Sequence, residues 1–191
     1  MGWLPRNFSP APYECLDIAE FAEGSIRMGL FRKAKEDGTM DYVIANAGTD
    51  PNSMADIIED VKQHFANTKG MKRSQNQAKD WIKDNIKEGD EVTNVGHSKG
   101  GLEATANALA TNTNAMVFDP APISKRVANK LQSNYDGNIT SYKVKGTFIR
   151  WIDPHRNAPV GRTVRLAPKY KGFHPSKNHH WDNINPRNVI K

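Results

Sequence analysis

The segment GHSKG, residues 96–100, places Ser98 between two glycines, a spacing that fits a catalytic nucleophile. A serine hydroxyl is a weak nucleophile at neutral pH. It therefore needs a base within hydrogen-bond reach and donors for the oxyanion that develops during acyl transfer. The glycines leave room for the tight strand-to-helix turn on which hydrolases expose such a serine. A glycine turn also binds phosphate or serves a purely structural role, so these five residues alone leave both interpretations open.

The residues around this segment favour the catalytic interpretation. The apolar segment 91–95 predicts a short strand that enters Gly96, and the alanine-rich segment 100–111 predicts the helix that follows. The start of that helix would place backbone N–H groups and a partial positive charge near a developing oxyanion. Ser98 is therefore predicted to be the nucleophile, with a structural turn as the alternative.

Predicted strands and helices alternate along most of the chain. Besides the two elements around Ser98, helices are predicted over 12–22, 53–65, 74–89 and 124–133, and strands over 25–33, 41–49, 115–119, 139–144, 147–153 and 163–167. This alternation is typical of a mostly parallel sheet covered by helices. We expect one α/β domain over residues 1–191, with a central sheet that carries helices on both faces.

Several segments resemble the class 3 lipase family, and they occur in that family's order. VTNVGHSKGGLEATANAL (92–109) is similar to its nucleophile segment, which reads G-H-S-L-G-G before a helix of alanines. YVIANAGTD (42–50) resembles the strand that ends in F-R-G-T, FIRWIDPHRNAPVG (148–161) resembles R-x-x-D-P-V-x-x-x-P, and HHWDNI (179–184) resembles H-S-x-D-N-Y. The resemblance covers about residues 40–185 and implies an α/β-hydrolase fold.

The resemblance also implies a set of active-site residues. The family's Ser–Asp–His order makes Ser98 the nucleophile, Asp153 the acid that orients the histidine, and His180 the base. The backbone N–H groups of Thr49 and Lys99 would bind the oxyanion. Chemistry of this kind requires no cofactor and no metal ion.

Each partner of Ser98 has an alternative in the sequence. Asp119 also ends a predicted strand and precedes a proline, so it is the alternative acid. His179 and His174 are the alternative bases. Lys99 stands where the family usually has leucine, and its ammonium could meet an anionic substrate or reach solvent. Because a long apolar lid is not evident either, a phospholipid or a short ester is as plausible a substrate as a triglyceride.

Positive charge is concentrated in the last part of the chain. The net charge is +6, yet residues 143–191 carry eleven Lys or Arg against two acids. Such a surface could contact an anionic membrane, or it could simply face solvent. No apolar run approaches the roughly 20 residues of a membrane span, and the N-terminus lacks a signal-peptide pattern. We expect a cytoplasmic protein or one exported by a specialised secretion system.

The segment HPSKNHHWDNINPRN, residues 174–188, supports a rival function. Three histidines and an aspartate in a basic region suit a metal-dependent nuclease, but their spacing matches no metal signature, and a nuclease would leave the glycine–serine turn unexplained. A non-lipid intracellular esterase and an inactive binding module are further alternatives. The sequence predicts a lipase- or phospholipase-type serine hydrolase that does not bind nucleic acid. Its resemblance to bacterial toxin domains implies an immunity protein as partner.

Overall fold

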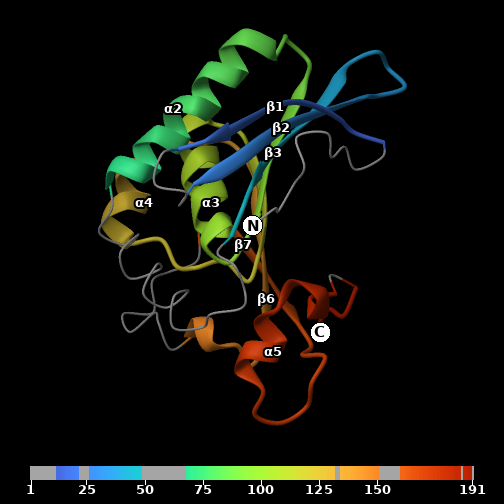
Figure 1. Cartoon of the computed structure of the whole chain (residues 1–191), viewed down its shortest axis with the longest axis vertical. Helices are drawn as coiled ribbons and strands as arrows, with labels where there is room; N and C mark the ends of the chain where they lie inside the picture. Colours follow the sequence, from blue (N-terminus) through green and yellow to red (C-terminus); the bar gives the residue numbers. More distant parts are fainter. Residues whose placement is uncertain are drawn as a thin grey trace.

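A seven-stranded sheet forms the centre of the computed structural model, which describes residues 12–21, 26–48, 68–131, 134–150, 160–185 and 187–190 (Figure 1). The strands lie side by side in the order in which they occur in the chain. They are β1 (Glu14–Glu20), β2 (Arg27–Ala34), β3 (Met40–Asn46), β4 (Glu91–His97), β5 (Asn114–Phe118), β6 (Ile139–Val144) and β7 (Arg162–Leu166). Neighbours from β1 to β3 are antiparallel, and all neighbours from β3 to β7 are parallel.

The first strand corrects the sequence prediction, which placed a helix over 12–22. Within this segment, Glu14–Glu20 form β1, paired antiparallel with β2, and the register shifts between Cys15 and Asp17. An extra residue at such an irregularity breaks the alternation of inward and outward side chains. The apolar residues then recur at a spacing that imitates a helix. Asp17 also accepts a hydrogen bond from the indole of Trp81 (2.8 Å), which ties this edge strand to a helix.

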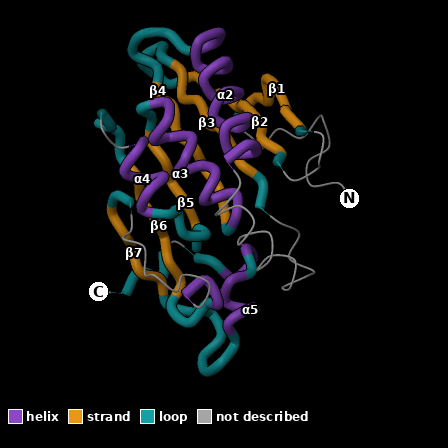
Figure 2. Tube along the Cα trace, turned by 90° about the vertical axis from the view of Figure 1, so that its left-hand side faces the viewer, coloured by secondary structure: helices purple, strands orange, loops and turns teal. Residues whose placement is uncertain are grey.

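The described helices are α2 (Thr68–Asn85), α3 (Lys99–Thr111), α4 (Lys125–Leu131) and the short α5 (Pro175–His179), with 3-10 turns η1 (Phe148–Arg150) and η2 (Trp181–Asn183). Figure 2 shows α2, α3 and α4 together on one face of the sheet. Crossovers between parallel strands are right-handed, so strands that follow one another in a single direction place all their helices on the same side. The sequence prediction placed helices on both faces of the sheet. Because α2, α3 and α4 all lie on one face, these three helices do not form the predicted layer on the other face. The helix predicted over 53–65 lies outside the described residues.

Two apolar clusters fill the space between the sheet and these helices. One gathers around α3 and includes Leu102, Ala106, Val117 and Phe148, and the other lies beneath α2 around Trp81. Ala104, Ala106 and Ala108 of α3 are completely buried, because small side chains let this helix pack directly on β4 and β5. The helix that follows Ser98 is thereby held as a rigid part of the core.

The strand predicted over 147–153 is not formed in the described part of that segment. Gly146 adopts a left-handed conformation (φ 81°) just after β6, which turns the chain away from the sheet. Phe148 and Ile149 then lie buried in the 3-10 turn η1 rather than in a strand. Residues 151–159 lie outside the described residues.

Candidate active site

Ser98 occupies a sharp turn between β4 and α3. Its backbone adopts φ 55° and ψ −123°, a conformation that costs energy for any residue with a Cβ. Two backbone hydrogen bonds hold it there: the Ser98 N–H donates to the carbonyl of Phe118 (3.1 Å), and its own carbonyl accepts from the N–H of Ala121 (2.9 Å). The strained turn is thus fixed to the end of β5, as a nucleophile turn requires.

The glycines beside Ser98 are required by close backbone contacts. A Cβ at Gly100 would overlap the carbonyl oxygen of Asn46, and a Cβ at Gly48 would lie 2.8 Å from the carbonyl oxygen of His97 and 3.9 Å from the Cβ of Ser98. The chain that leaves β3 therefore passes directly beside the serine. This is where the sequence expects the first oxyanion donor, Thr49, which itself lies outside the described residues.

Ser98, His179 and Asp119 form one continuous hydrogen-bonded row. The His179 Nε2 atom lies 2.9 Å from the Ser98 Oγ atom, and its Nδ1 atom lies 2.5 Å from the Asp119 Oδ2 atom. With the proton on Nδ1 donated to the carboxylate, Nε2 accepts the hydrogen bond of the serine hydroxyl. All three residues are at most 3% exposed. This geometry and order of groups can perform nucleophilic acyl transfer.

The histidine at Ser98 is His179, one of the alternatives, so the sequence prediction of His180 at this position is wrong. The two residues stand at the end of α5, His179 as its last residue and His180 as its C-cap. Successive side chains on a helix point about 100° apart, so only one of the pair can face the serine. His174 is the N-cap of the same helix and packs its ring against Tyr170, with 6.0 Å between ring centroids.

The carboxylate at His179 belongs to Asp119, the alternative acid, whereas Asp153 lies outside the described residues. Asp119 follows β5 directly and has a left-handed backbone (φ 39°). Its N–H donates to the carbonyl of Tyr142 (2.6 Å) on β6. The carboxyl ends of parallel strands meet at one edge of the sheet, and this brings Asp119 beside Ser98.

His97, the residue before the nucleophile, connects the serine turn to α5. Its Nε2–H donates to the backbone carbonyl of His179 (2.8 Å), and the two rings lie 4.6 Å apart. Burial, together with the positive charge that His179 can carry, lowers the pKa of His97 to about 3, so the ring is neutral and keeps a donor. Sequence analysis missed this role because the partner lies 82 residues away and no spacing signals the contact.

Aromatic side chains surround the hydrogen-bonded row. Phe148 meets the His179 ring edge-on at 4.5 Å, and Trp181 packs against His97 (5.7 Å) and Phe118 (5.1 Å). These apolar neighbours limit access of water to the imidazole and strengthen its hydrogen bonds. Trp181 is nevertheless 46% exposed, so it forms part of the surface next to the site.

The Lys99 side chain is buried, contrary to the expectation that it meets substrate or solvent. It is 3% exposed, and its Nζ atom lies 3.8 Å from the Glu103 Oε1 atom one turn further along α3. Burial raises the pKa of Glu103 to about 8, against the opposing effect of the Lys99 charge. The Lys99 backbone begins α3 directly after Ser98.

Residues 14–169 match a phospholipase-like family described as the Tle-like phospholipase domain. The chain belongs to this family. The sequence prediction of a lipase-like or phospholipase-like domain is confirmed at the level of the family, whereas the assignment to class 3 stays a prediction. A crystal structure of a lipase from Rhizopus microsporus var. chinensis is similar, with 13% identity and a TM-score of 0.45. The match covers 84% of this chain and 63% of the lipase. No match was found among curated proteins.

The rival nuclease function depended on a metal site built from the histidines of residues 174–188, which follow the matched range 14–169. Within the described ranges, no group of three or more His, Cys, Asp or Glu side chains could hold a metal ion. His179 instead contacts Ser98 and Asp119. Among the helices that the structure describes, none is both long and apolar enough to cross a bilayer.

Proposed function

We propose that this domain hydrolyses an acyl ester of a phospholipid through a covalent acyl-Ser98 intermediate, with His179 as the base and Asp119 as its orienting acid. The observation that carries the proposal is the row of hydrogen bonds from Asp119 through His179 to the Ser98 Oγ atom. The family description supplies the substrate class. The proposal replaces Asp153 and His180 by the two alternatives that the sequence already contained.

The proton path follows from the tautomer of His179. As the Ser98 Oγ atom attacks the ester carbonyl, its proton moves to the Nε2 atom, and Asp119 stabilises the imidazolium through the Nδ1–H. The tetrahedral intermediate collapses when the C–O bond to the alcohol breaks, and His179 gives its proton to that alcohol. A water molecule then loses a proton to the same Nε2 atom and attacks the acyl-serine, which releases the fatty acid and restores Ser98.

The oxyanion donors are proposed to be the backbone N–H groups of Lys99 and Thr49. Lys99 is the first residue of α3, and the partial positive charge of the helix start favours an anion there. The close approach of Gly48 to Ser98 supports Thr49, which follows it in the chain. A donor from each side of the serine would bind the oxygen where negative charge develops.

The basic C-terminal part supports contact with an anionic membrane as a component of this function. Residues 143–191 carry eleven basic residues, and attraction to acidic head groups raises the local concentration of enzyme at its substrate. We further propose, from the resemblance to bacterial toxin domains, that the domain acts as a delivered effector that an immunity protein inhibits in the producing cell.

A fluorophosphonate probe tests the nucleophile, because it reacts covalently only with an activated serine. We expect the wild-type protein to be labelled and the Ser98→Ala variant to stay unlabelled. Ser176→Ala is the matched control, since this exposed serine of α5 lies outside the row and its loss should leave labelling intact. Equal labelling of Ser98→Ala and wild type would overturn the proposed mechanism.

Fatty acid release tests the substrate. The wild type should hydrolyse both phospholipid vesicles and a soluble short-chain ester. The Ser98→Ala variant should hydrolyse neither substrate. Hydrolysis of the soluble ester alone, with intact vesicle lipids, would contradict the phospholipid substrate and favour the non-lipid esterase.

A further inference from the structure

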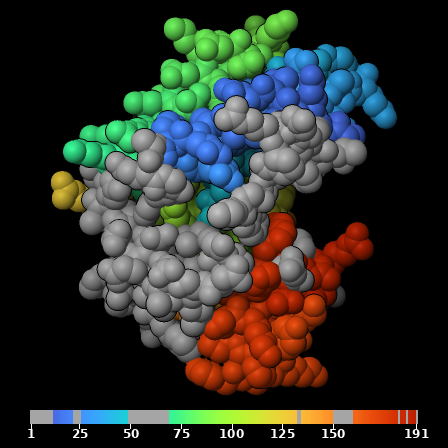
Figure 3. Space-filling view, viewed as in Figure 1, coloured from blue at the N-terminus to red at the C-terminus, as the bar shows by residue number. Residues whose placement is uncertain are grey.

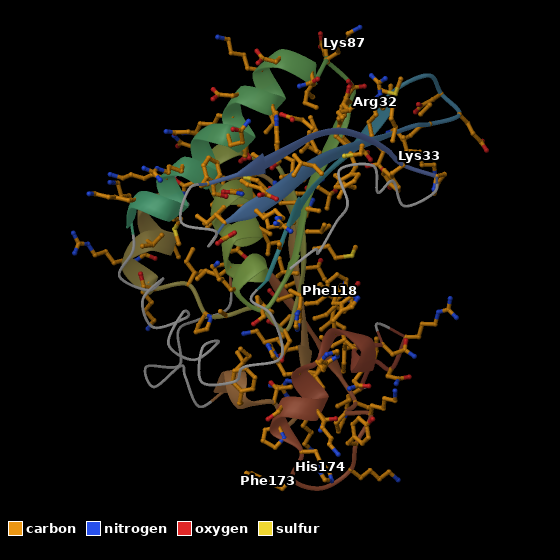
Figure 4. All side chains as sticks on the ribbon, viewed as in Figure 1. Arg32, Lys33, Lys87, Phe118, Phe173 and His174 are labelled. Atoms are coloured by element: carbon orange, nitrogen blue, oxygen red, sulfur yellow. The ribbon has the colours of Figure 1, made fainter. Side chains whose placement is uncertain are left out.

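The chain between β7 and α5 presents a phenylalanine to solvent. Phe173 is 79% exposed, by far the most exposed of the large apolar side chains in the described ranges. It follows Gly172, whose left-handed conformation (φ 88°) turns the chain sharply at this point. Figure 4 shows Phe173 and His174 at one end of the molecule, far from Arg32, Lys33 and Lys87 at the other. In Figure 3, the C-terminal segment (red) forms that same end.

Exposed basic side chains flank this phenylalanine in the sequence. Lys169, Lys171 and Lys177 are all exposed, and the sequence contains no Asp or Glu from residue 154 to residue 181. Two of these lysines lie near the ring of Tyr170, Lys169 at 5.8 Å and Lys177 at 5.5 Å. An apolar side chain flanked by positive charges is complementary to a layer with an apolar interior and anionic groups at its surface.

The loop is fixed to the helix that carries the proposed base. Asn178, which is 1% exposed, accepts a hydrogen bond from the N–H of Tyr170 and donates one to its carbonyl, both at 2.9 Å. Lys169 donates a third hydrogen bond to the side chain of Asn183 (2.9 Å). These contacts fix the start of the loop that carries Phe173 to α5 and η2, so less conformational freedom of the loop backbone is lost on binding.

We propose that Phe173 and its three lysines form a membrane anchor, in which the phenylalanine inserts into an anionic lipid surface while the lysines contact the head groups. This inference rests on the proposed function, to which it adds the contact that brings the enzyme to its substrate. Aromatic and basic side chains are the residues that bind the interface of a bilayer. The exposed Trp181 follows His179 by two residues and packs on His97, so the same C-terminal segment carries the anchor loop and an aromatic side chain at the site.

Vesicle co-sedimentation of the Ser98→Ala protein tests the anchor without hydrolysis of the lipid. The protein should bind vesicles of phosphatidylcholine mixed with phosphatidylglycerol, and bind pure phosphatidylcholine vesicles much more weakly. Phe173→Ser should weaken binding to the mixed vesicles about tenfold, because an apolar ring no longer leaves water. Lys171→Gln with Lys177→Gln should weaken it about 25-fold, at about fivefold for each lysine near the surface.

The matched control is Lys33→Gln with Lys87→Gln, which removes the same charge from the opposite end of the molecule and should change binding less than twofold (Figure 4). Circular dichroism of each variant establishes that it is folded. Three results would overturn the anchor. The control and loop variants could lose binding equally, both loop changes could leave binding unchanged, or the parent protein could fail to bind vesicles. Loop-dependent binding to duplex DNA in place of vesicles would also overturn it. The binding assay uses the inactive Ser98→Ala protein. Its result therefore remains valid even if the hydrolysis experiments contradict the proposed function.

Discussion

The proposed triad is assembled from two regions that are held in different ways. Ser98 and Asp119 follow adjacent parallel strands, and each is bonded through its backbone N–H to the chain on the next strand or its end. His179 instead ends α5, a helix of five residues, and reaches the rest of the site through its own ring and through the His97 bond to its carbonyl. One side of the site belongs to the core of the sheet, and the other is attached to it by a few hydrogen bonds and by aromatic contacts of Phe148 and Trp181.

This difference shows where precision in the site originates. The strands fix two of the three groups to within the tolerance of a packed core. The third depends on hydrogen bonds to the other two groups and to His97, and on the edge-on contact of its ring with Phe148. Substitutions on the α5 side should therefore change catalysis more readily than they change folding, whereas the Ser98 side is tied to stability.

The two adjacent histidines give the largest expected contrast. His179→Ala should lower kcat about 10,000-fold or more, because the serine then has no base. His180→Ala should keep kcat within about tenfold, since the ring at Ser98 is retained. Steady-state hydrolysis of a soluble ester measures both, and equal losses would contradict the assignment of the base.

The two candidate acids give the next contrast. Asp119→Asn should lower kcat about 10,000-fold, because an amide favours the wrong tautomer of His179. The same change at Asp153 should leave kcat near the wild-type value, with thermal melting as the check on folding for both variants. The reverse result would make Asp153 the acid that orients His179. It would also contradict the conclusion that two of the three groups of the triad follow adjacent strands of the sheet.

His97 tests whether α5 needs its attachment to the serine turn. His97→Phe removes the donor to the His179 carbonyl, and a displacement of about 1 Å at the base should lower kcat about 100-fold with little change in KM. His97→Gln, which retains an N–H donor of similar reach, should recover part of that loss. A fall in melting temperature with unchanged kcat for both variants would instead make His97 purely structural.

Glu103 tests the stability of the Ser98 side, with the smallest expected effect. Burial raises its pKa to about 8 in the folded protein, from an ordinary value of 4.5. Between these values the folded state holds a proton that the unfolded state has released, so the free energy of unfolding falls as pH rises from about 4.5 to about 8. Glu103→Gln should remove the part of this fall in the free energy of unfolding that is due to the titration of Glu103. Urea unfolding at pH 5 and pH 8 measures it, and an unchanged pH dependence would contradict the assignment.

The nucleophile turn could be predicted from the sequence because its determinants are local. Ser98, its flanking glycines, the strand before and the small-residue helix after all lie within one short segment. The strands from β2 to β7 were predicted from the same alternation, with one extra strand predicted over 147–153 that the described part of that segment does not form. The edge strand β1 could not be predicted, because its irregular register imitates helical spacing and its pairing with β2 is a tertiary contact.

The partners of Ser98 were harder to assign because they depend on long-range geometry. Asp119 and Asp153 both precede a proline after an apolar segment, and neighbouring His179 and His180 differ only in the direction that the end of α5 gives each ring. Nothing in one sequence fixes that direction. The buried orientation of Lys99 was equally hidden, because it follows from the packing of α3 in the core.

The bond from His97 to the His179 carbonyl makes the spacing of the proposed catalytic groups independent of chain length. Two residues that are neighbours in sequence, His97 and Ser98, both contact one residue about 80 positions later. The loops between Asp119 and His179 can therefore lengthen or shorten at small entropic cost without moving the base. Relatives of this domain should diversify those loops, and with them the surface that meets the lipid, while the catalytic distances stay constant.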